Sequence, residues 1–205
     1  MHETRAHWDE VWEGRDPTET SWFQADPTTS HRLVTDVRPG TDAELIDVGG
    51  GASRLLDRLL EDGWPSITVL DIAPASLAAP RARLGDRAEA VRWETGDVLE
   101  YDHGGQVDVW HDRAVLHFLT DDADRAAYVE RCASTVRAGG HAVVATFAPD
   151  GPEQCSGLPV RRSAASDLAA LFNASFTLVH DERVVHRTPW DTEQAFTFVT
   201  LRRRP

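Results

Sequence analysis

Short apolar runs alternate with longer segments of helical periodicity through most of the chain. The apolar runs predict strands, and the longer segments repeat apolar residues at the spacing of one helical face. Predicted strands cover residues 43–48, 67–71, 90–93, 107–110 and 141–147, and predicted helices cover 53–60, 74–84 and 121–136. Strands that alternate with helices in this way indicate a parallel sheet with crossover helices, which is an α/β doubly wound fold.

The C-terminal third departs from this alternation. Gly139-Gly140 is expected to end the preceding helix. Beyond the strand that follows, a proline-containing segment leads to a short helix predicted over 166–172. The last two apolar runs, at 176–186 and 194–201, predict an antiparallel pair of strands.

The N-terminal segment lies outside the alternation. We expect residues 1–40 to form a helical lid and residues 41–205 to form a Rossmann-like core. A chain of 205 residues with 41% hydrophobic content can bury one substantial core. A single domain over 1–205 is therefore expected.

The charge balance narrows the classes of partner. Lys and Arg number 21 against 34 Asp and Glu, which gives a formal net charge of -13. Such a charge repels phosphate backbones and anionic lipid surfaces. We therefore expect a small-molecule substrate and neither nucleic acid nor a membrane as partner, while a basic protein substrate stays compatible with the charge.

The cysteines and the first residues predict the compartment. Cys132 and Cys155 are far apart and have no neighbouring metal-ligand spacing, so neither a disulfide framework nor a bound metal is expected. The chain has no apolar signal region at its start and no run of about 18 apolar residues. These features predict a cytoplasmic protein.

A glycine turn follows the first predicted strand, in the sequence Asp47-Val48-Gly49-Gly50-Gly51. In an open parallel sheet the ligand crevice lies at this point, although an ordinary tight turn would also use glycine. Asp71 comes about 20 residues later, where an acid can accept ribose hydroxyls. Arg54 replaces the third glycine of the dinucleotide fingerprint, which favours a nucleoside without phosphates. We expect Arg54 to be a solvated helix charge, with contact to a phosphate as the alternative.

These segments resemble the class I S-adenosylmethionine-dependent methyltransferases. The resemblance covers most of the chain, and it extends to Arg137-Ala138-Gly139-Gly140-His141, where Ala138 replaces the usual proline of the family's turn. It implies a seven-stranded sheet of order 3-2-1-4-5-7-6 with the seventh strand antiparallel. It also implies S-adenosylmethionine as cofactor.

The resemblance assigns cofactor roles to individual positions. The methionine half falls to Asp47, Gly49, Gly50, Gly51 and Ser53; the ribose falls to Asp71, with Ile72 against adenine; and Gly96, Asp97 and Val98 form the adenine motif. Asp97 would receive the adenine amino group, but aspartate after glycine also commonly serves as a turn or cap residue.

The end of the fourth strand carries a dense group of titratable residues, 111–119. Asp112, Arg113 and His117 are candidate catalytic residues, with Asp112 also expected beside the cofactor. His117 would act as a general base, although methyl transfer depends mainly on alignment. Alternatively, Asp112 and Arg113 pair and brace the loop, or Arg113 attracts an acidic substrate. His111 is the weakest candidate, as the end of a buried strand.

The same stretch lacks a feature of one branch of the family. Members that methylate amides or bases carry an Asp/Asn-Pro-Pro-aromatic motif there, and residues 111–114 do not match it. Methylation of adenine or of a glutamine amide is therefore disfavoured.

The N-terminal segment is rich in tryptophan. It resembles the opening of thiopurine, tellurite-resistance and thiol or halide methyltransferases, and similar Trp-Phe steps open some protein-lysine methyltransferases. We expect Trp8 and Trp12, four residues apart, to pack on the sheet as a helix face. The resemblance implies that Trp22 and Gln24, around Phe23, contact the cofactor.

Together these features predict an S-adenosylmethionine-dependent enzyme that methylates a small molecule at sulfur, oxygen or nitrogen. One alternative is a protein-lysine methyltransferase. Another is a non-catalytic nucleoside-binding module or a nicotinamide-dependent oxidoreductase, against which the missing third glycine argues.

Overall fold

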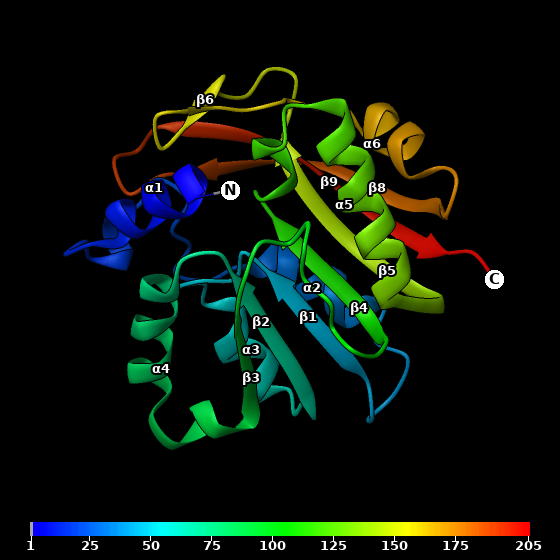
Figure 1. Cartoon of the computed structure of the whole chain (residues 1–205), viewed down its shortest axis with the longest axis horizontal. Helices are drawn as coiled ribbons and strands as arrows, with labels where there is room; N and C mark the ends of the chain where they lie inside the picture. The colour runs from blue at the N-terminus through cyan, green and yellow to red at the C-terminus, as the bar shows by residue number, and fades with distance from the viewer. Residues whose placement is uncertain (1) are drawn as a thin grey trace.

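The computed structural model describes residues 2–205, with side chains from residue 5 onward. Within these residues, seven strands form one sheet in the order β3-β2-β1-β4-β5-β9-β8 (Figure 1). The strands are β1 Glu44–Val48, β2 Ser66–Asp71, β3 Val91–Thr95, β4 Val107–Arg113, β5 Val136–Phe147, β8 Phe176–Arg187 and β9 Glu193–Arg203. β1 to β5 are parallel, and β9 runs antiparallel between β5 and β8. This confirms the predicted doubly wound sheet and its order, with β8 and β9 as the sixth and seventh strands.

Helices cover both faces of the sheet, and a small hairpin follows β5. The helices are α1 His2–Trp12, α2 Thr28–Asp36, α3 Leu55–Glu61, α4 Ala78–Leu84, α5 Asp122–Thr135 and α6 Ala165–Phe172. Short 3₁₀ turns are η1 Pro17–Glu19, η2 Pro74–Leu77, η3 Gly85–Ala90 and η4 Leu116–Phe118, and the hairpin is β6 Gln154–Cys155 with β7 Leu158–Pro159. None of the helices described is long and apolar enough to cross a bilayer.

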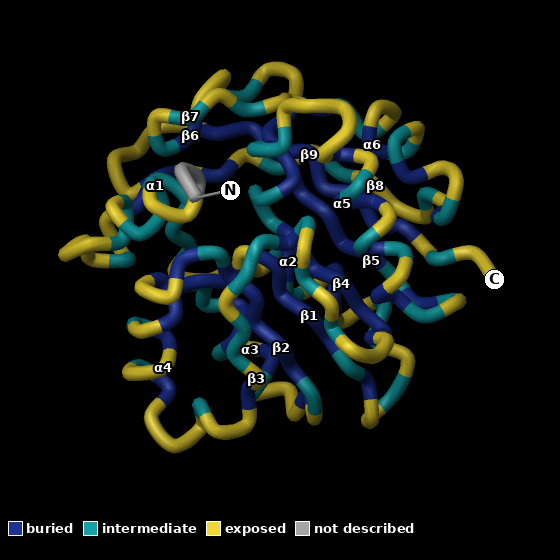
Figure 2. The backbone as a smooth tube through the Cα atoms, viewed as in Figure 1, coloured by how far each residue is buried: buried dark blue, intermediate teal, exposed yellow. Residues whose placement is uncertain are grey.

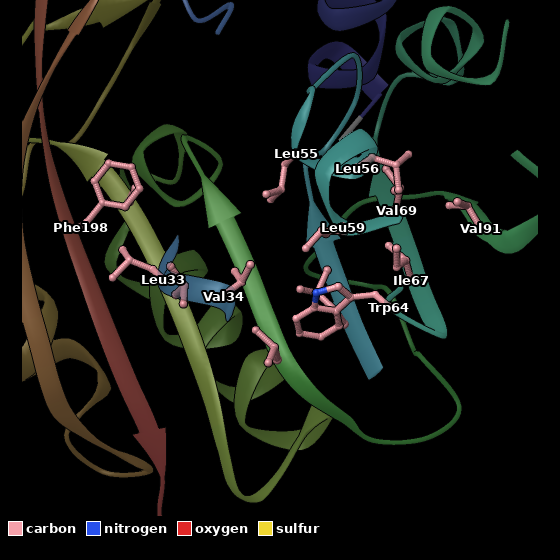
Figure 3. Close-up of a cluster of buried hydrophobic side chains, with 14 of the residues drawn as sticks. Leu33, Val34, Leu55, Leu56, Leu59, Trp64, Ile67, Val69, Val91 and Phe198 are labelled. Atoms are coloured by element: carbon pink, nitrogen blue, oxygen red, sulfur yellow. The ribbon is translucent and has the colours of Figure 1, made fainter. Parts of the chain in front are cut away.

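One apolar core joins α2 and α3 to the sheet (Figure 3). Leu33 and Val34 of α2 and Leu55 and Leu59 of α3 are all at most 3% exposed. Part of the predicted N-terminal lid therefore belongs to the core, because α2 packs on the same face as α3. α1, by contrast, lies beyond the ends of the strands, against η2 (Figure 1).

A second core lies on the opposite face, under α5 and α6. Trp110 of β4 and Tyr128 of α5 are fully buried there, and the Trp110 indole donates a hydrogen bond to the Tyr128 hydroxyl at 2.9 Å. The central strands are buried along most of their length, whereas exposure concentrates on outer helix faces and loops (Figure 2). Two cores sandwiching one sheet hold the strand ends in fixed positions.

The sequence predicted that Gly139-Gly140 would end a helix, but in the structure the two glycines lie within a strand. α5 ends at Thr135, and β5 starts at Val136 and passes through the glycines as a bulge, where the β4–β5 register shifts. Gly139 has a φ of +81°, and a Cβ at Gly140 would lie 2.7 Å from the Asp108 carbonyl oxygen. The glycines therefore allow the bulge to pack closely on β4.

Candidate functional site

A cavity opens where β1 and β4 end, between the glycine turn and the N-terminal segment. The N-terminal side contributes Trp12, Pro17, Thr20, Trp22, Phe23, Gln24, Pro27 and Ser30, and the sheet side contributes Asp47, Val48, Gly49, Gly50, Gly51, Ala52, Ser53, Arg54, His111 and Arg113. The structure thus brings together Trp22, Gln24, the glycine turn and Arg113, which are far apart in the sequence. β4 extends to Arg113, three residues beyond the predicted strand, and so carries His111 and Arg113 on the face toward the cavity.

Each glycine of the turn makes room for a particular neighbour. A Cβ at Gly49 would lie 2.1 Å from the Val115 side chain, and the backbone there has a φ of +64°. A Cβ at Gly50 would lie 2.6 Å from the Asp47 carboxylate, and one at Gly51 would lie 2.9 Å from Asp71. The turn therefore needs glycine for close packing as well as for backbone conformation.

Asp47 is held at the base of the cavity by a histidine. Its Oδ1 lies 2.6 Å from Nδ1 of His111, and Nε2 of His111 lies 2.9 Å from Oγ of Ser30. Asp47 Oδ2 is buried and has no hydrogen-bond partner among the described residues. Asp47 therefore keeps one enclosed carboxylate oxygen, packed beside Gly50, without a hydrogen-bond partner in the part of the chain that the structure describes.

Arg113 supplies the opposite charge. Nη1 donates to the Trp22 carbonyl oxygen at 3.1 Å, and the guanidinium carbon lies 4.5 Å from the centre of the Phe196 ring. Nε and Nη2 are enclosed without a hydrogen-bond partner among the described residues. Burial lowers the pKa of Arg113 to about 10, so the side chain stays a cation at neutral pH. It does not pair with Asp112, which lies on the other face of β4.

Aromatic rings join the N-terminal segment to the site. The Trp22 ring centre lies 6.1 Å from that of Trp8 and 5.8 Å from that of Trp12, and Trp8 lies 5.0 Å from Phe118, all edge to face. Trp8 and Trp12 thus pack on Trp22, and Trp8 also packs on Phe118 of η4, whereas the sequence predicted that both would pack on the sheet. The cluster fixes Trp22 over the cavity.

The predicted nucleoside residues lie at the ends of β2 and β3 and are not part of the cavity lining, although Asp71 lies next to Gly51 of the turn. Asp71 accepts a hydrogen bond from the Ala73 N–H at 2.9 Å, and its backbone carbonyl accepts from Gly96 at 3.0 Å. Burial raises the pKa of Asp71 to about 6. Asp97 accepts from the Leu99 N–H at 2.9 Å, which is the turn-forming role considered as the alternative. Ile72 is half-buried, and Val98 belongs to the second core.

Two predicted catalytic residues lie away from the cavity lining. Both oxygens of Asp112 are engaged, Oδ1 by the Val115 N–H and Oδ2 by the Leu116 N–H and the Tyr128 hydroxyl. His117 is fully buried, and its ring centre lies 4.6 Å from that of Phe147. Burial, with the Arg113 charge, lowers the pKa of His117 to about 3. Asp112 thus braces the η4 turn, and a ring of such weak basicity does not suit a general base.

Ser30 and Arg54 enter the cavity without having been predicted there, and His111 was the weakest candidate. Ser30 had no signal, since nothing in the sequence places it beside a residue 81 positions away. Arg54 was interpreted as a solvated helix charge. A longer fourth strand would have identified His111, because it would put that residue on the same face as Arg113.

A family model described as a methyltransferase domain matches residues 46–142. This stretch runs from the first strand into the fifth and includes the glycine turn, Asp71, Asp97 and Arg113. No curated protein sequence matches the chain.

Solved structures match over nearly the whole chain. A structure from work on the conversion of a disulfide bond into a thioacetal group during echinomycin biosynthesis has a TM-score of 0.80 and 18% identity, covering 98% of this chain and 93% of that one. The Burkholderia thailandensis 1,6-didemethyltoxoflavin-N1-methyltransferase, with its substrate and S-adenosylhomocysteine bound, has a TM-score of 0.71 and 25% identity, covering 100% and 90%. The N-methyltransferase NodS from Bradyrhizobium japonicum WM9, with S-adenosylhomocysteine, has a TM-score of 0.71 and 16% identity, covering 96% and 98%.

Proposed function

We propose that the chain is a class I S-adenosylmethionine-dependent methyltransferase, with S-adenosylmethionine as its cofactor, and that it methylates a small molecule at sulfur, oxygen or nitrogen. The observation that carries this proposal is the cavity formed by the glycine turn, Asp47 and Arg113 together with the N-terminal segment. Arg113 lies at the end of β4, beside the glycine turn, where an acceptor can be held against the cofactor.

The residues present fit this cofactor. Glycines that leave no space for a Cβ let a ligand approach the main chain, and the free oxygen of Asp47 suits an ammonium group. We assign the methionine half to the glycine turn, Asp47 and Ser53, and the ribose to Asp71. The adenine falls to Ile72, Gly96, Asp97 and Val98, with Trp22 and Gln24 covering the site from the N-terminal side. When bound, the cofactor supplies an electrophilic methyl group on a sulfonium.

The chain contributes alignment and exclusion of water rather than a strong base. His117 is buried among aromatic rings and Asp112 is engaged in the η4 turn. The cavity, whose lining also includes Arg54, offers the enclosed guanidinium of Arg113 to an acceptor. A guanidinium with two enclosed N–H groups free attracts an acidic acceptor and favours the anionic form of a thiol or acid. Positioning of such a nucleophile accounts for most of the rate gain expected in methyl transfer.

Two further features support a small molecule over a protein side chain. Trp12, Trp22 and Gln24 line the cavity and supply aromatic and amide surface suited to a small planar acceptor. The toxoflavin-precursor enzyme among the neighbours also holds a small aromatic molecule. Methylation of a protein lysine is the second candidate, and the net negative charge of the chain, which suits a basic protein substrate, is the observation that favours it.

Screening for S-adenosylhomocysteine formation tests the proposal. Thiols, phenols, amines and carboxylic acids are each offered with S-adenosylmethionine, in pairs that differ only in a carboxylate or its neutral amide. We expect turnover on at least one small molecule, with the carboxylate member of the pair preferred by about tenfold, the scale of one charge-assisted hydrogen bond.

The Arg113→Gln variant is the control for the charge. It keeps hydrogen-bonding capacity but removes the cation, so it should lose the preference for the carboxylate while retaining affinity for S-adenosylhomocysteine to within about threefold. Turnover confined to proteins from a cell extract, with none on the small molecules, would replace the proposal by the lysine alternative.

A further inference from the structure

Three buried polar side chains form a continuous hydrogen-bonded array between α2, β4 and β1. Ser30, His111 and Asp47 are 2%, 3% and 2% exposed. Oγ of Ser30 lies 2.9 Å from Nε2 of His111, and Nδ1 of His111 lies 2.6 Å from Oδ1 of Asp47. All three residues line the cavity, so the Ser30–His111–Asp47 array connects the N-terminal segment to the base of the glycine turn.

The fold places this array within an otherwise apolar row. Asp47 and His111 are register partners on adjacent parallel strands, flanked by Val69 on β2 and Val143 on β5. Burying polar groups costs free energy unless they are hydrogen-bonded, and an apolar pair would fill the same row without that cost. The array is therefore not required by the core, and its position in the cavity points to a role with a ligand.

The carboxylate sets the direction of the hydrogen bond between His111 and Asp47. An ionised carboxylate only accepts, so Nδ1 of His111 donates to Asp47. Nε2 of His111 shares the other hydrogen bond with the Ser30 hydroxyl, which can either donate or accept. Asp47 is thereby held through one oxygen, and its second oxygen is left buried and free of partners among the described residues.

We propose that His111 is a positioning residue, which orients Asp47 so that its free oxygen receives the ammonium group at the amino-acid end of the cofactor. Ser30 holds the imidazole of His111 in place. Because Ser30 belongs to α2, the packing of α2 on the sheet is thereby coupled to recognition of the cofactor's ammonium group. The inference rests on the proposed function and extends it to residues outside the glycine turn. Arg113, two positions beyond His111 on the same face of β4, is the opposite charge in the cavity and does not contact the array in the hydrogen bonds described.

Two substitutions of His111 distinguish the roles of its two ring nitrogens, Nδ1 and Nε2. The amide nitrogen of asparagine takes the place of Nδ1, whereas that of glutamine reaches the place of Nε2. His111→Asn should therefore keep the bond to Asp47 and bind S-adenosylhomocysteine within about threefold of the wild type. His111→Gln should bind it at least about tenfold more weakly, the scale of one charge-assisted hydrogen bond.

A second ligand separates positioning from a general effect on folding. 5′-Methylthioadenosine shares the nucleoside but lacks the amino-acid end, so titration calorimetry should give both variants the wild-type affinity for it. Ser30→Ala should weaken S-adenosylhomocysteine by about two- to threefold, because the histidine stays bonded to Asp47.

Equal affinities of the asparagine and glutamine variants for S-adenosylhomocysteine would overturn the inference. Parallel losses for both ligands in His111→Gln would do so too, since they indicate a structural role only. If both variants keep full affinity but lose turnover on an acceptor found in the screen, His111 is a proton acceptor instead. Failure of the wild type to bind S-adenosylhomocysteine would count against the proposed function itself.

Discussion

Gly50→Ala should lose at least about tenfold in affinity for S-adenosylhomocysteine and about 1–3 kcal/mol in the free energy of unfolding, the usual cost of overpacking a buried position. The added Cβ would lie 2.6 Å from the Asp47 carboxylate and 2.9 Å from the Val69 side chain. Neither neighbour can move freely, because Asp47 is bonded to His111 and Val69 is packed in β2. Calorimetry and chemical denaturation measure the two effects.

Gly105→Ala is the matched control for that variant. Gly105 lies in the loop before β4, and a Cβ there would meet only His103, at an ordinary 3.9 Å. We expect unchanged affinity and a change in unfolding free energy within about 0.5 kcal/mol. If Gly50→Ala bound the ligand as Gly105→Ala does, close packing of the turn on Asp47 would have no part in cofactor recognition.

Asp71→Ala should weaken S-adenosylhomocysteine by about 1–3 kcal/mol, which is the cost of leaving ribose hydroxyls without their buried acceptor. Asp86→Ala removes an exposed carboxylate from η3 and should leave the affinity unchanged. Wild-type affinity in Asp71→Ala would contradict the ribose assignment.

The same carboxyl predicts how binding depends on pH. Burial raises the pKa of Asp71 to about 6, so the group protonates as pH falls through that value. The ionised form is the better acceptor, and affinity should fall by up to about tenfold between pH 7 and pH 5. The effect on the free energy of unfolding has the opposite sign. Because the pKa of Asp71 is higher in the folded state than in the unfolded chain, Asp71 destabilises the fold above pH 6, and this destabilisation is lost as pH falls from 6 toward 4. Asp71→Asn should flatten the binding profile, whereas an unchanged profile would assign the titration to another group.

The fold was predictable because its signals are local. Each strand and its following helix show their periodicity within a few turns, as at 43–48 and 53–60, and the resemblance gave the order of the strands. Gly139-Gly140 was misassigned because a helix end and a bulge both favour glycine, and only the position of Asp108 on the neighbouring strand distinguishes them.

The site was predictable only in part, because several of its contacts join distant residues. The turn at Gly49–Gly51 was predictable from its position after the first strand, and the step Trp22 to Gln24 from the resemblance; both line the cavity. The partnership of His111 with Asp47 depends on strand register, and that with Ser30 on how α2 packs. His117 has the residue type of a base, but burial decides its basicity, and burial is set by the whole fold.

Titration of the wild-type protein with S-adenosylhomocysteine and, separately, with NADH tests the central claim most directly. The glycine turn with Asp47 and Arg113, and the substitution of Arg54 for a third glycine, predict one S-adenosylhomocysteine bound per chain and no heat of binding with NADH. Binding of NADH without S-adenosylhomocysteine would contradict the account.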